Sequence, residues 1–143
     1  MLTELEWELA KRLLLAMGCG AVIGIERELR KSPAGLRTHA LVCMGSALFT
    51  IASFLVTGPN VDASRIAAQV AVGMGFIGGG IIVKSRDKVL GVATAADLWA
   101  VAGLGLIIGL GAFRIAFIAT LLIVGILTFG YFFERRAFQK KEY

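Results

Sequence analysis

The sequence predicts an all-α integral membrane protein, a bundle of five transmembrane helices with the N-terminus outside and the C-terminus in the cytoplasm. Hydrophobic residues make up 57% of the 143 residues, charged residues 17%, and the mean hydropathy is +0.80. Soluble domains average about 45–50% apolar and about 25% charged residues. The apolar residues gather in five runs, and the fifteen Lys and Arg residues cluster at the ends of these runs. Composition and charge placement therefore agree on the membrane class.

Short polar or turn-forming segments separate the five runs, at 32–35, 58–60, 84–88 and 111–114. The predicted spans, in chain order, are residues 2–25, 38–56, 65–84, 92–110 and 115–133. We expect residues 1–134 to form one transmembrane domain and residues 135–143 a basic cytoplasmic tail.

The first span is predicted from a short apolar run, residues 13–25. Lys11 and Arg12 precede this run, but their long side chains can carry the charge toward water, and Trp7 suits a membrane interface. The helix is therefore expected to begin near Leu2. A four-span alternative, with this helix lying on the membrane surface, would disturb the division of basic residues described below.

The third span is rich in glycine. Eighteen uncharged residues separate Arg65 from Lys84, and five of them are glycines. Lipid-embedded helices associate where small residues let backbones approach, and Gly75 and Gly79 have that spacing. We expect this helix to be the hub of the bundle. Residues 73–78 also match the dinucleotide motif G-x-G-x-x-G, but they lie inside an apolar span rather than between a strand and a helix, so nucleotide binding is rejected.

Several glycines fall at spacings that suit close helix packing. More of them are present than one small bundle needs, so we expect a homo-oligomer surrounded by the lipid bilayer. The glycines assigned to helix packing are Gly20, Gly24, Gly73, Gly75, Gly78, Gly79 and Gly103.

The orientation follows from the distribution of Lys and Arg over the two sides of five spans. One side carries Arg27, Arg30, Lys31, Arg37, Lys84, Arg86, Lys88, Arg135, Arg136, Lys140 and Lys141. The other carries Lys11, Arg12, Arg65 and Arg114. Eleven against four places the first side in the cytoplasm.

Other classes of protein find little support. The net charge of +5 comes from residues that flank apolar runs, so nucleic-acid binding is not expected. Cys19 and Cys43 lie inside apolar segments and have no metal-binding spacing. No nucleophile with an adjacent base, zinc spacing or P-loop is present, so we expect no enzyme.

Asp97 interrupts the fourth span. A carboxylate inside a membrane helix costs about 2.5–3.5 kcal/mol on insertion scales, so it is expected to face protein or water and to have a partner. Two interpretations stay open. Asp97 forms a cation or proton site, or it forms a structural ion pair with Arg37 or a loop lysine.

The end of the first helix carries a second charged group, Glu26-Arg27-Glu28. Carboxylates two residues apart do not share a helix face, so we expect Glu26 alone to point into the bundle and to pair with Arg37 or Arg27. A solvated charge cluster is the alternative. If Mg²⁺ binds, one or two carboxylates with retained water are the expected ligands, and Asp97 with Glu26 would supply them. No other cofactor is expected.

Three further polar residues lie in or beside the spans. Gln69 is expected to bridge helices rather than to line a transport path. His39, the single histidine, is either an interfacial residue or a pH switch. Thr94 lies three residues before Asp97 on the same helix face, where it would share a ligand with that carboxylate.

Blocks of residues in the order of a known family support the membrane assignment. The blocks are Gly24-Ile-Glu-Arg-Glu28, Ala34-Gly-Leu-Arg-Thr-His39 with Gly45-Ser-Ala47, Arg65-Ile-Ala-Ala-Gln69 with Gly73-x-Gly-Phe-Ile-Gly78, and Gly91-x-x-Thr-Ala-Ala96 with Leu98-Trp99. Together they resemble the MgtC/SapB family, in a short form without the C-terminal ACT-type domain.

The resemblance implies a multi-pass protein of the bacterial or archaeal inner membrane that takes part in magnesium homeostasis. It further implies a regulatory role through contact with another membrane complex, such as F-type ATP synthase. The alternative hypothesis is a small Mg²⁺ or cation transporter or channel that uses Asp97 and Glu26 for ion transport.

Overall fold

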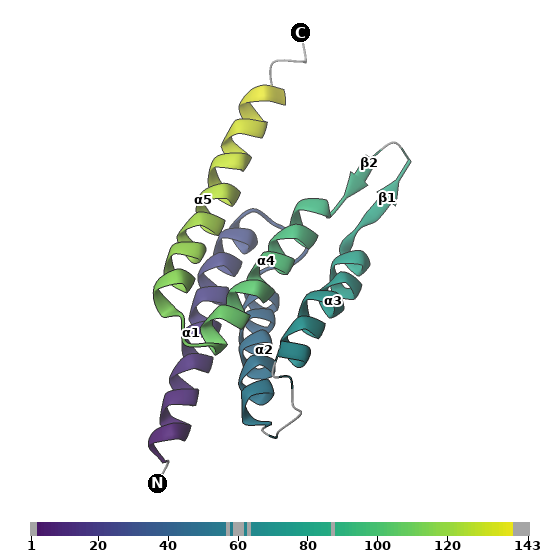
Figure 1. Cartoon of the computed structure of the whole chain (residues 1–143). Helices are drawn as coiled ribbons and strands as arrows, with labels where there is room; N and C mark the ends of the chain where they lie inside the picture. The colour runs from purple at the N-terminus through teal and green to yellow at the C-terminus, as the bar shows by residue number, and fades with distance from the viewer. Residues whose placement is uncertain (1–2, 57, 59–61, 63, 87, 139–143) are drawn as a thin grey trace.

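The computed structural model describes residues 3–56, 58, 62, 64–86 and 88–138. It contains the helices α1 (Glu4–Leu29), α2 (Leu36–Leu55), α3 (Ser64–Ile81), α4 (Val92–Gly109) and α5 (Phe113–Phe138), and the strands β1 (Val83–Ser85) and β2 (Lys88–Leu90). Figure 1 shows that successive helices run in alternating directions between two ends of the bundle. The α1–α2 connection, the hairpin and the end of α5 lie at one end, opposite the N-terminus (Figure 1).

Three helices are long and apolar enough to cross a membrane: α2, α4 and residues 113–133 of α5. The predicted all-helical membrane architecture is confirmed at this level. Among the described residues, α1 and α3 do not meet the same criterion. Every stretch of α1 long enough to span contains at least three charged residues, and in α3 the mean hydropathy is lowered by Arg65, Gln69 and the glycines. Five crossings and the orientation therefore stay predictions.

The core lies where α2 meets α1 and α4. Cys43 and Ala47 of α2 are fully buried against Ile23 of α1 and against Val101 and Leu104 of α4. Close packing of this kind maximises dispersion contacts, which matter in a bilayer because lipid chains are as apolar as the side chains.

Glycines bring these helix backbones together. A Cβ atom at Gly24 of α1 would lie 2.7 Å from Leu36 Cα, and one at Gly20 would overlap the His39 carbonyl oxygen. On α4, a Cβ at Gly109 would lie 2.6 Å from Thr50 Cβ. A second α4 glycine, Gly105, approaches the Cys43 carbonyl oxygen in the same way. Real Cβ atoms do not tolerate such distances, so these positions require glycine.

The glycine-rich helix α3 is not the hub of the described structure, which corrects the expectation from the sequence. Of its five glycines, only Gly78 has a neighbour for an added Cβ, Ala95 at 3.4 Å. Met74 is the other buried residue, whereas Phe76 is 88% exposed. Glycine removes the side chains that would fill a wider interface, so α3 contacts the bundle along one narrow face. The remaining α3 glycines, Gly73, Gly75, Gly79 and Gly80, and also Gly103 of α4, have no neighbour within 4 Å of an added Cβ.

A hairpin replaces the loop predicted over 84–88. Val83 pairs with Leu90 and Lys84 with Val89 in an antiparallel register. The apolar residues that flank the polar turn favour extended structure, and Arg86 adopts a positive φ of 39° at the turn.

The fifth helix extends past its predicted end at 133 and reaches Phe138. Glu134-Arg-Arg-Ala is a sequence of good helix formers, so the helix continues into the predicted tail. Residues 139–143 of that tail lie outside the described residues, as do residues 59–60 of the predicted turn at 58–60.

Arg12 joins the first and fourth helices at the N-terminal end of the bundle. Its Nη1 donates a 2.8 Å hydrogen bond to the carbonyl oxygen of Gly109 at the C-terminus of α4. The last carbonyls of a helix lack partners within the helix and carry partial negative charge, so a guanidinium stabilises this end.

We expect Arg12→Met to lower the free energy of unfolding by about 1.5–3 kcal/mol, the range for hydrogen bonds to charged groups. Denaturation of the detergent-solubilised protein with increasing SDS would measure this. Lys11→Met is the matched control, because Lys11 is 53% exposed in the side chain and contacts only surface neighbours on its own helix, Glu8 and the Trp7 ring, among the described residues. Its expected cost is below about 1 kcal/mol, and equal losses in both variants would contradict the helix-capping role of Arg12.

Candidate functional site

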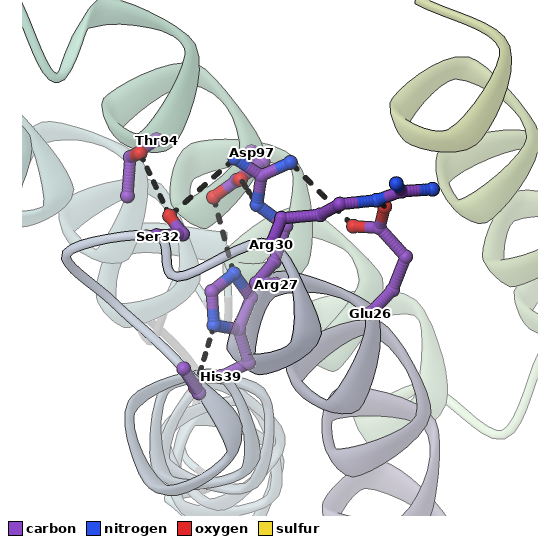
Figure 2. A network of polar contacts seen from close by, with 8 residues as sticks. Glu26, Arg27, Arg30, Ser32, His39, Thr94 and Asp97 are labelled. Atoms are coloured by element: carbon purple, nitrogen blue, oxygen red, sulfur yellow. Dashed lines mark hydrogen bonds and ion pairs between the residues drawn. The ribbon is translucent and has the colours of Figure 1, made fainter. Parts of the chain in front are cut away.

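Asp97 holds three helices together at the end of the bundle where α1 ends and α2 and α4 begin. It lies roughly one and a half turns into α4, and its side chain is 3% exposed. Arg27 Nε of α1 is 2.9 Å from Asp97 Oδ2, and His39 Nε2 of α2 is 3.1 Å from Asp97 Oδ1. Figure 2 shows both side chains pointing at the carboxylate. One acidic residue therefore has a basic partner on each of two neighbouring helices.

The packing of α1 against α2 brings His39 into this position. Gly20 and Gly24 let the first turns of α2 lie directly on α1. As a result His39 is completely buried rather than interfacial, and its Nδ1 is 2.8 Å from the carbonyl oxygen of Gly35.

The contact between Arg27 and Asp97 is an ion pair rather than an aligned hydrogen bond. The atoms are 2.9 Å apart, yet Arg27 Nε and Asp97 Oδ2 are both buried without a hydrogen bond of acceptable angle. Electrostatic attraction in a poorly solvated site does not need a linear N–H···O arrangement, so the distance identifies the pair.

A second layer of contacts surrounds Arg27. Its Nη1 lies 3.5 Å from Glu26 Oε2, and its Nη2 donates to Ser32 Oγ at 3.4 Å. The Ser32 hydroxyl lies 3.0 Å from that of Thr94 in α4. The α1–α2 turn is thereby tied to the first turn of α4 (Figure 2).

Glu26 extends the network to the last helix. Its Oε1 accepts from Arg30 Nε at 3.1 Å, and the Arg30 guanidinium lies 3.9 Å from the ring centroid of Tyr131 in α5. A guanidinium over an aromatic face is a favourable cation–π geometry. The network Asp97, Arg27, Glu26, Arg30 therefore reaches from α4 through α1 to α5.

The structure places several predicted site residues elsewhere. The expected partner of Asp97 and Glu26, Arg37, is exposed and forms no ion pair within the described part of the chain. The Glu28 carboxylate accepts from the backbone N–H of Leu36 at 2.9 Å instead of joining the network. Gln69 lies exposed on α3. Thr94 is close to Asp97 in sequence but contacts Ser32 rather than sharing a ligand with the carboxylate.

Two members of the network, Arg30 and Ser32, were not predicted from the sequence. The spacing of Arg30 from Glu26, one helical turn, was a usable signal. Ser32 was identified only as a turn residue, and its side-chain contacts depend on where α4 lies.

Magnesium does not fit the two predicted carboxylates in this arrangement. Mg²⁺ needs oxygen ligands in near-octahedral geometry and retains several waters. Both oxygens of Asp97 face the Arg27 and His39 side chains, and both oxygens of Glu26 face Arg27 and Arg30. A cation there would be repelled by the guanidinium groups. Among the residues that the structure describes, no group of three His, Cys, Asp or Glu side chains forms a metal site either. We therefore assign these acids to ion pairs and not to metal ligation.

Comparison with known proteins gives one family. Residues 13–136 match the family model described as "MgtC family". The chain is 48% identical over 112 residues to "Protein MgtC" of Salmonella typhimurium, which covers 78% of this chain and 48% of the relative. It is 43% identical over 122 residues to "Putative magnesium transporter YhiD" of Escherichia coli K12, covering 80% of this chain and 56% of the relative.

A third relative has a similar identity and similar coverage. The chain is 42% identical over 121 residues to "Uncharacterized protein slr0014" of Synechocystis, covering 84% of this chain and 51% of the relative. No solved structure matches the chain. The chain spans about half the length of these curated relatives. Because the family model covers most of the sequence, the chain belongs to the MgtC family.

Proposed function

We propose that the chain is a multi-pass inner-membrane protein of magnesium homeostasis that acts by contact with another membrane complex. F-type ATP synthase is the first candidate partner, because the family resemblance suggests it. Family membership and the name of the YhiD relative support the link to magnesium. One observation favours contact with a partner protein over ion conduction. It is the close packing between α2 and α4 on the side of the charged network toward the C-terminal end of α4.

A cation leaving the network along α2 would meet a closed interface. Ser46 and Thr50 are buried hydroxyl residues on this path, but their side chains pack directly on Gly105 and Gly109 of α4. The Thr50 hydroxyl donates to the Ser46 carbonyl of its own helix at 2.9 Å. Transport needs polar groups accessible at successive depths, and this interface has no room for a hydrated ion.

The exposed side of α3 is suited to contact with another membrane protein. Gly75 and Gly79 are open to close approach by a further helix, and Phe76 between them is 88% exposed. A groove of about 490 Å³ runs between α2 and α3, lined mostly by apolar residues together with Ser46 and Gln69. An exposed amide at this depth favours a protein neighbour that can hydrogen-bond to it over lipid.

Cross-linking tests the proposed contact. A photo-reactive amino acid at Phe76 is expected to cross-link to membrane subunits of F-type ATP synthase in magnesium-starved cells. The matched control is Leu122 on α5, which is 61% exposed. Equal cross-linking of these subunits from both positions, or none from Phe76, would contradict a specific contact through α3.

The alternative function is magnesium transport, which the name of the Escherichia coli relative, a putative magnesium transporter, favours. Proteoliposomes with an internal Mg²⁺ dye separate the two functions. We expect uptake no faster than in protein-free vesicles, with helicity and insertion of the protein verified. Saturable uptake that Asp97→Asn abolishes would establish transport and overturn the contact proposal.

A further inference from the structure

The hydrogen-bond partners of His39 determine where its ring carries hydrogen. Nδ1 lies 2.8 Å from the backbone carbonyl oxygen of Gly35, one turn earlier in the chain. A carbonyl oxygen only accepts hydrogen bonds, so Nδ1 must donate and therefore carries a hydrogen. The opposite tautomer would place two lone pairs against each other at 2.8 Å, on a ring that is completely buried.

The second ring nitrogen then faces a second acceptor. His39 Nε2 lies 3.1 Å from Asp97 Oδ1. In a neutral imidazole with hydrogen on Nδ1, Nε2 carries a lone pair, and an ionised carboxylate oxygen carries only lone pairs as well. Both residues are buried, so no solvent separates these groups. The contact is attractive only if one additional proton lies between the two atoms.

We propose that His39 and Asp97 form a proton-binding site between α2 and α4, with the bound proton on His39 Nε2. Arg27 decides the location of the proton. Its guanidinium lies 2.9 Å from Asp97 Oδ2, where it forms an ion pair with a carboxylate that carries no proton, so the shared proton is assigned to the imidazole. The pair is thus an imidazolium–carboxylate ion pair with Arg27 on the far oxygen.

The surrounding charges all come from the helices already described. From α1 and the residue that follows it, Arg27 contacts Asp97 directly, and Glu26 and Arg30 follow one and two contacts further out. The Glu28 carboxylate of α1 accepts from the Leu36 N–H, next to the Gly35 carbonyl that His39 contacts. The Ser32 hydroxyl accepts from Arg27, and the Thr94 hydroxyl lies 3.0 Å from that of Ser32. Within the described ranges, no charged side chain of α3, α5 or the hairpin forms an ion pair with His39 or Asp97.

Proton release has a structural consequence. It would leave two lone pairs facing each other between α2 and α4, while the Arg27–Asp97 pair would still join α1 to α4. Loss of this proton is therefore expected to weaken the α2–α4 contact at this end, while the Arg27 contact persists. The site responds to protons independently of any role in magnesium homeostasis.

Nitrogen NMR of the full chain tests the proposal directly. His39 is the only histidine, so ¹⁵N-histidine labelling gives one pair of ring signals. At neutral pH both nitrogens are expected to show protonated shifts, and as the pH is raised Nε2 is expected to change to the unprotonated type while Nδ1 does not. An Nε2 signal of unprotonated type throughout the pH range below neutrality would overturn the proposal.

Two variants sharpen the test. In Asp97→Asn the amide can donate to Nε2, so the extra proton should be lost at a lower pH than in the unmodified protein. Glu8→Gln is the matched control, because this carboxylate pairs with Lys11 and Arg12 near the other end of α1, so the behaviour of the His39 ring signals with pH should be unchanged. Identical titrations for Asp97→Asn and the unmodified protein would also overturn the proposal. If Asp97→Asn does not fold, the titration of the unmodified protein alone decides.

Discussion

Replacing Asp97 by alanine is expected to lower the free energy of unfolding by about 3–5 kcal/mol, the cost of removing one partner from a buried ion pair. Arg27 and His39 would both lose their contact with the carboxylate, although their side chains are only 13% and 0% exposed. Titration of the detergent-solubilised protein with SDS, followed by helical circular dichroism, measures this loss.

Two control variants are needed to interpret the Asp97→Ala result. Glu8→Gln removes a carboxylate that is 40% exposed and pairs only with Lys11 and Arg12 near the N-terminus, so its expected cost is below about 1 kcal/mol. The double variant Arg27→Met with Asp97→Leu replaces the pair by apolar groups and should recover part of the stability. A loss for Asp97→Ala as small as that for Glu8→Gln would contradict a stabilising role for the network.

Replacing Gly105 by alanine is expected to cost about 1–3 kcal/mol or more, because the added methyl group forces two packed helices apart. The new Cβ would overlap the Cys43 carbonyl oxygen and lie 2.7 Å from Ser46 Cβ. These neighbours are a backbone atom and the first atom of a side chain, so neither can rotate away. The same SDS titration reports the change in stability.

Gly103→Ala is the matched control on the same helix. No atom lies within 4 Å of a Cβ added there, so the variant should be neutral or slightly more stable, since alanine is the better helix former by roughly 1 kcal/mol. Similar losses for both variants would show that the α2–α4 interface is not packed as described.

The membrane class and the approximate helices were readable from the sequence. Long apolar runs predict both ends of α2 and α4 and the start of α5 to within two residues, because hydropathy and length depend on the chain alone. The burial of Asp97 was also predictable, since a carboxylate inside an apolar helix needs a partner.

Only the tertiary structure decided which residues meet. Gly103 and Gly105 are equivalent in the sequence, but two positions correspond to about 200° around a helix, so one faces α2 and the other faces away. For the same reason Asp97 pairs with Arg27 and His39 instead of Arg37, which lies on the exposed side of the first turn of α2. The sequence by itself determined which segments are helical and which charges must be neutralised. The rotation of each helix, set by packing around α2, determined the partners.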